Sequence, residues 1–137
     1  MQQVQIAGKT YPILFDANVL AKVQERYQSV DNLGEALGEI KETIWILTQT
    51  INEAQRYREV VEGQPREEDP MTEERLGMLL TGDDLFSNSS LAQAIIYAFE
   101  EGMGGRKNRE AGRRKKNRSG RRKKKAVSTL PGSSTSP

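Results

Sequence analysis

Residue types that commonly carry out chemistry are scarce in this chain of 137 residues. It contains no cysteine and no histidine, which excludes disulfides, thiol nucleophiles and imidazole ligands or bases. Neighbouring carboxylates remain as candidates for binding a hard cation or for acid–base catalysis. They occur at Glu67-Glu68-Asp69, Glu73-Glu74, Asp83-Asp84 and Glu100-Glu101.

None of these acidic clusters has the spacing of a calcium-binding loop, and none adjoins a glycine-rich phosphate loop. We interpret all four as solvated loops and helix ends, where charged residues normally lie. We therefore expect no catalytic residue, no cofactor-binding residue, no metal site and no enzymatic activity.

The charged residues are distributed very unevenly. Residues 1–104 contain 8 Lys+Arg and 18 Asp+Glu, a net charge of −10, whereas residues 105–137 contain 13 and 1, a net charge of +12. The chain is therefore an acidic domain, predicted to span residues 1–103, followed by a basic tail. From Gly104 onward no apolar periodicity is present, so we expect residues 104–137 to be disordered in isolation.

The basic run is the feature with the most obvious class of partner. Such a run attracts nucleic acid, an anionic surface or an acidic protein. It has no interleaved aromatic residues to stack on bases, which argues against sequence-specific recognition. We expect at most a weak, nonspecific nucleic-acid contact, through Arg113, Arg114, Lys115, Lys116, Arg121, Arg122, Lys123, Lys124 and Lys125.

The central element is predicted to be a long amphipathic helix over residues 33–61. Apolar residues follow each other at gaps of four and three, which places them on one face of a helix. A set of charged and amide residues, including Glu42 and Glu53, is predicted to form the opposite face, and Trp45 lies nearer to it. Trp45 is expected under the hairpin, on a neighbouring helix or at a partner surface. The helix is weakened near Gly34 and Gly38 and is expected to be firm only from about Glu39. The apolar stripe is Leu33, Leu37, Ile40, Ile44, Leu47, Ile51, Ala54 and Val61, interrupted by Arg58.

Shorter elements are predicted on both sides of this helix. Period-two alternation indicates a β-hairpin with strands near 3–7 and 10–15 and a turn at Gly8. Asp16 is expected to cap a helix that ends near Gln28, and Thr72 to cap one that ends at Gly82. Ser90 and Gln93 are expected to form a capping box for a last helix to about Glu101.

Together these elements predict an α+β fold, mainly α, with an N-terminal β-hairpin packed on a small helical bundle of four helices. The longest apolar runs are far shorter than the ~20 residues of a membrane span. Residues 1–8 lack the basic start and apolar core of a signal peptide. We therefore expect no membrane contact, and a location in the cytoplasm of the cell that makes the protein.

The order of these segments resembles the tail assembly chaperones of long-tailed bacteriophages of Gram-positive hosts. The resemblance covers roughly residues 3–103. One part of the resemblance is Pro70-Met71-Thr72-Glu73-Glu74, which is expected to open a late helix, as a "Pro–x–Thr–Glu–Glu"-like step often does in the family. The other part is the order of five segments: VQIAGKTYPILFD, ANVLAKVQERY, ETIWILTQTINEA, DPMTEERLGMLL and LAQAIIYAFEEGM.

The resemblance implies a role in viral morphogenesis without catalysis. Proteins of this family hold the tape measure protein and help recruit tail tube proteins, and they are absent from the mature virion. Many also have a longer form made by programmed frameshift. The basic tail is not covered by the resemblance, and the alternative is a small nucleic-acid-binding or regulatory protein acting through that tail. Self-association of the domain is also left open.

Overall fold

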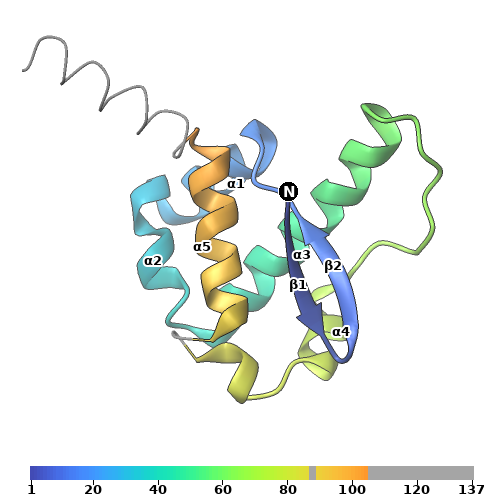
Figure 1. Ribbon diagram of the computed structural model, residues 1–137. Helices are drawn as coiled ribbons and strands as arrows, with labels where there is room; N and C mark the ends of the chain where they lie inside the picture. The colour runs from blue at the N-terminus through green and yellow to red at the C-terminus, as the bar shows by residue number, and fades with distance from the viewer. Residues whose placement is uncertain (87–88, 105–137) are drawn as a thin grey trace, which may run out of the picture. The chain divides into compact units, whose positions relative to one another are not determined.

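The computed structural model describes residues 1–86 and 89–104 (Figure 1). Their elements are the strands β1 (Gln2–Ile6) and β2 (Lys9–Ile13), five α-helices and two 3₁₀ turns. The α-helices are α1 (Ala17–Tyr27), α2 (Leu33–Ala36), α3 (Ile40–Val60), α4 (Glu73–Leu79) and α5 (Ser90–Gly102). The 3₁₀ turns are η1 (Val30–Asn32) and η2 (Asp83–Leu85).

The predicted fold class is confirmed, since a two-stranded antiparallel hairpin precedes a set of helices that it packs against. β2 lies against α3 and β1 lies against α5 (Figure 1). The inward side chains of the hairpin alternate along the strands, as period two requires. They are fully or almost fully buried at Val4, Ile6, Tyr11 and Ile13.

The core of residues 1–103 lies between this hairpin and α3. Ile46, Leu47 and Ile51 of α3 are completely buried, and Ile95 of α5 is buried beside them. Leu14 N donates to Thr50 O at 3.2 Å, which joins the end of the hairpin to the middle of α3. In the described ranges 1–86 and 89–104, no helix is both long enough and apolar enough to cross a membrane.

The single helix predicted over residues 33–61 is wrong in one respect, because α2 and α3 are separate helices. Glu39 has an extended main chain (φ −114°, ψ 131°), and Ile40, predicted to lie on the apolar stripe, is 60% exposed. The Thr43 hydroxyl donates to the Leu37 and Glu39 carbonyls at 3.2 and 3.1 Å. The break falls at Gly38, next to the expected firm start of the helix near Glu39, whereas Gly34 lies within α2. Leu37, at the end of α2, belongs to the buried core.

The buried face of α3 is also wider than the predicted stripe. Thr50 is buried although it was not predicted to face the core, and Val61 at the end of the stripe is exposed. Ile46, which was expected to widen the stripe on one side, is also buried. The Thr50 hydroxyl donates to Ile46 O at 2.9 Å, so this buried polar group is satisfied. The hairpin, α1 and α4 all pack against α3, which explains why more than one face of it is covered.

Two of the three predicted helix caps are confirmed. Asp16 caps α1 and Thr72 caps α4, as predicted. The predicted cap at Ser90 is wrong, because the Ser89 hydroxyl accepts from Ala92 N and Ser90 is already helical. The helix α4 ends at Leu79 and not at Gly82, since Leu80 is extended. The prediction of a disordered tail falls, from residue 105 on, outside the described residues.

Candidate functional site

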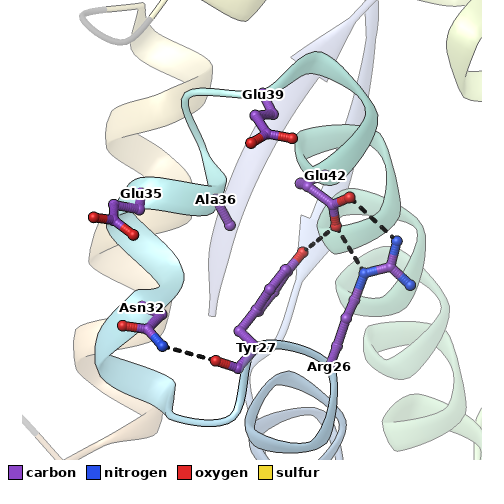
Figure 2. A pocket seen from close by; sticks show the side chains of 7 residues that line it. All are labelled: Arg26, Tyr27, Asn32, Glu35, Ala36, Glu39 and Glu42. Atoms are coloured by element: carbon purple, nitrogen blue, oxygen red, sulfur yellow. Dashed lines mark hydrogen bonds and ion pairs between the residues drawn. The ribbon is translucent and has the colours of Figure 1, made fainter.

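A surface groove of about 480 Å³ lies where α1, η1 and α2 meet the start of α3 (Figure 2). Its wall is formed by α1 residues Arg26 and Tyr27 and by Glu42 on the first turn of α3. The opposite side carries α2 and the segment after it. The lining residues are Arg26, Tyr27, Asn32, Glu35, Ala36, Glu39 and Glu42.

Glu42 is the centre of the hydrogen bonds in this groove. Arg26 Nε donates to Glu42 Oε1 at 2.7 Å, and Tyr27 Oη donates to the same oxygen at 2.7 Å (Figure 2). The Arg26 hydrogen bond, and next the Tyr27 hydrogen bond, hold the pKa of Glu42 below its ordinary value. Burial, followed by the hydrogen bond to Glu42, raises the pKa of Tyr27. These contacts tie the end of α1 to the start of α3.

Trp45 of α3 contacts both α1 residues of the groove wall. The Arg26 guanidinium lies 4.4 Å from the centre of the Trp45 ring, and the Tyr27 and Trp45 rings meet edge to face at 5.8 Å. A guanidinium over an indole is a favourable cation–π arrangement. Of the locations left open for Trp45, the structure therefore shows the one on a neighbouring helix, α1.

The groove can attract a cation but is poorly suited to proton transfer. Glu35 and Glu39 are exposed carboxylates on its open side. The pKa of Glu42 is lowered, and the hydrogen bond to Glu42 raises the pKa of Arg26. Both pKa values are therefore moved further from neutral pH. General acid–base catalysis is most efficient with a pKa near the working pH. The chemistry of these residues is therefore electrostatic.

A second carboxylate cluster lies about three turns further along the same face of α3 and was not anticipated. Glu53, predicted to be on the polar face, is only 6% exposed, and Asn18 Nδ2 donates to Glu53 Oε2 at 3.0 Å. A hydrogen bond with the Asp16 carboxyl, and secondly burial, raise the pKa of Glu53. Arg56 lies 3.7 Å away but is mostly exposed. This cluster joins the N-terminus of α1 to α3.

The predicted acidic clusters lie in separate places and are not brought together. Glu68 forms an ion pair with Lys9, and the Asp84 carboxylate accepts from Thr81 N at 2.9 Å. Glu73 and Glu74 lie in the first turn of α4, and Glu101 accepts from Gln2. Over residues 1–86 and 89–104, no group of three or more acidic side chains could hold a metal ion.

The basic residues predicted to contact nucleic acid, Arg113–Lys116 and Arg121–Lys125, lie outside the described residues. The groove residues were missed because each is ordinary in sequence. The spacing of Arg26, Tyr27, Glu42 and Trp45 has no local signature, since they meet only after α1 and α3 pack. A weak signal was available in Trp45, whose position off the apolar stripe required a separate contact.

Comparisons with protein-family models, with curated proteins and with solved structures gave no match to this chain.

Proposed function

We propose that the protein is a tail assembly chaperone of a long-tailed bacteriophage, which holds the tape measure protein and helps recruit tail tube subunits. The observation that carries the proposal is the order of its elements. A hairpin, a short helix, a long Trp-bearing helix, a helix opened by Pro70-Met71-Thr72-Glu73-Glu74 and a last helix follow each other in residues 1–103. The resembled family has this layout.

The charge of the domain supports the same role. Residues 1–104 carry 8 Lys+Arg and 18 Asp+Glu. A strong net charge opposes self-aggregation while a protein covers an aggregation-prone segment of another chain. A chaperone of this kind needs no catalytic group, and the electrostatic and structural roles of Glu42 and Glu53 are compatible with that.

The genomic and virion contexts test this function directly. We expect a tail tube gene before the gene for this chain and a tape measure gene after it. We also expect mass spectrometry to find the protein in infected-cell lysates, in the host cytoplasm, but not in purified virions. A gene far from any tail gene, or a protein present in virions in tail-protein amounts, would contradict the proposal.

The alternative function is binding of nucleic acid through the basic tail. It is favoured by the 13 Lys+Arg of residues 105–137. Binding through phosphate contacts would fall steeply between ~50 and ~200 mM salt because counterions are released. We expect such binding to be weak at physiological salt, and removal of residues 105–137 to abolish it. Tight DNA or RNA binding by the whole chain at physiological salt would favour this alternative.

A further inference from the structure

Lys9, Tyr11 and Arg58 meet where the hairpin packs near the C-terminal end of α3. Lys9 and Tyr11 lie two residues apart on β2, so their side chains are on the same face of the strand. Tyr11 is only 4% exposed, and the Lys9 ammonium lies 5.5 Å from the centre of its ring. Arg58 comes four residues after the fully buried Ala54 and continues the apolar stripe of α3. The stripe therefore places a cation beside the hairpin.

A hollow of about 200 Å³ lies between β2, the end of α3 and the segment that follows α3. Three cationic side chains line it, and two of them are already paired. The Lys9 ammonium pairs with Glu68, and Arg66 Nη2 lies 2.9 Å from Glu59 Oε1. The third, Arg58, is half-buried, and within the described residues no ion pair or hydrogen bond holds its guanidinium. Its charge is therefore available to a ligand.

The Tyr11 hydroxyl is a second polar group that lines the hollow without a protein partner. In residues 1–86 and 89–104 no side chain or main-chain group forms a hydrogen bond with it. The hydroxyl of a buried tyrosine normally has a partner. Tyr27 follows this rule although it is less deeply buried, since its hydroxyl donates to Glu42 at 2.7 Å. The group that fills the hollow is therefore the expected partner of Tyr11.

We propose that this hollow binds a carboxylate, with Arg58 as the charged partner and Tyr11 as a neutral hydrogen-bond donor. A guanidinium only donates and a phenol hydroxyl can donate, so the ligand atom that both contact is an acceptor. The charge of Arg58 favours an anionic oxygen, because hydrogen bonds between ionised groups are the stronger ones. The proposal goes beyond the chaperone function and does not depend on it.

The other lining residues favour a carboxylate over a phosphate. Glu67 and Glu68 also line the hollow, and they oppose a doubly charged phosphate more strongly than a singly charged carboxylate. The volume of about 200 Å³ is below the range of pockets for drug-sized ligands, and it suits one acidic side chain or a small carboxylic acid.

Four probes test this chemistry on the full chain at constant ionic strength. They are the blocked tripeptide acetyl-Gly-Glu-Gly-amide, its glutamine counterpart, acetate and inorganic phosphate. NMR follows the Arg58 guanidinium and the Tyr11 amide during each titration. We expect saturable shifts with the glutamate tripeptide and none with the glutamine tripeptide, because only the carboxylate pairs with a guanidinium. Acetate binding as tight as that of the tripeptide would identify a small acid as the source of the carboxylate, and weaker acetate binding a polypeptide.

Tyr11→Phe and Tyr27→Phe are matched variants, because each removes one hydroxyl. Tyr11→Phe should weaken binding of the glutamate tripeptide at least about threefold, and it should leave the melting temperature of the unliganded chain unchanged because no protein hydrogen bond is lost. Tyr27→Phe should retain tripeptide binding and lower the melting temperature, because its hydrogen bond to Glu42 is lost.

Arg58→Met and Arg56→Met separate a local contact from a general effect of charge. Both remove one positive charge from α3, but Arg56 lies outside the hollow and is mostly exposed. We expect Arg58→Met to weaken tripeptide binding at least about tenfold, and Arg56→Met to weaken it less than about twofold. Equal losses in the two variants would overturn the proposal. So would phosphate binding tighter than that of either carboxylate, or the absence of a saturable shift with every probe, which would mean that the hollow holds only water.

Discussion

Leu47 and Ile44 lie one turn apart on α3 but differ in burial. Leu47 is fully buried, whereas Ile44 is partly exposed at the edge of the core. Leu47→Ala should lower the free energy of unfolding by about 2–5 kcal/mol, because it leaves a cavity. Ile44→Ala should cost clearly less, because water can fill the space. Thermal and denaturant unfolding measure both, and equal losses would show that α3 is not packed as described.

The two glutamates of α3 that meet α1 have opposite pKa shifts, so the same substitution should have opposite effects. The pKa of Glu53 is raised, so its contribution to stability is present below the unfolded pKa of about 4.3 and is lost as pH rises through the folded pKa. The pKa of Glu42 is lowered, so its contribution is present above about 4.3 and is lost as pH falls through the folded pKa.

Glu53→Gln is therefore expected to stabilise the protein at pH 7 by about 1 kcal/mol, since the neutral amide can donate to Asp16 and still accept from Asn18. Glu42→Gln should destabilise it at pH 7 by up to about 1 kcal/mol through the weakened bond to Arg26. Both differences should shrink as pH falls below the ordinary range of glutamate. Urea unfolding at several pH values measures them, and shifts of the same sign in both variants would contradict the assignment.

For single residues, the sequence predicted the hydrogen bonds that cap helices better than the contacts that side chains make with other helices. Asp16 and Thr72 were identifiable as caps because a cap bonds its own neighbours. The burial of Glu53 was not, because helical periodicity placed it on the polar face and only the packing of α1 covers it. The same holds for Glu42, whose partner Arg26 is on another helix.

Among the elements, α5 depends on a close approach that only glycine allows. A Cβ added at Gly102 would lie 2.1 Å from the Phe15 carbonyl oxygen, at the junction of the hairpin and the helix. Gly102→Ala should therefore destabilise the protein by about 1–3 kcal/mol or force α5 to shift. Gly77→Ala in α4 is the matched control, because its Cβ would meet only Ile44 at 3.9 Å.

We expect Gly77→Ala to stabilise α4 by about 0.5–1 kcal/mol, the usual gain for alanine over glycine within a helix. Melting temperatures of the two variants should thus move in opposite directions. A Gly102→Ala protein as stable as the wild type would show that α5 does not approach Phe15 so closely. The sequence predicted that the last helix ends near Glu101, but the closeness of Gly102 to Phe15 arises from tertiary contact.

Elements were predicted correctly where the sequence pattern that specifies them lies within a few neighbouring residues. Alternation in the hairpin and the caps of α1 and α4 depend on neighbouring residues, and they were predicted. The firm start of α3 was expected near Glu39 from the two glycines, and its N-cap is Glu39, but the separate helix α2 was not predicted because Leu33 and Leu37 continue the apolar spacing. The candidate groove was not predictable at all, since it forms where α1, α2 and α3 meet.

At the scale of the whole molecule, residues 1–103 form one compact unit, and the buried core lies within it. We therefore expect a chain ending at Gly104 to keep the melting temperature of the full chain within about 2 °C, since surface changes alter stability little. Trypsin should also trim the full chain to near that point, because exposed Lys/Arg-rich segments are readily cut. A large loss of stability on truncation, or a tail resistant to trypsin, would contradict this division.

The central claim is that residues 1–104 are a chaperone for a tail protein. Its most direct test is the soluble fraction of the tape measure protein co-expressed with the full chain, with residues 1–104 or with neither, extracted at ~50 and ~200 mM salt. We predict that residues 1–104 suffice and that the higher salt reduces the soluble fraction only slightly. A tape measure protein that stays insoluble with residues 1–104 and with the full chain would contradict the claim.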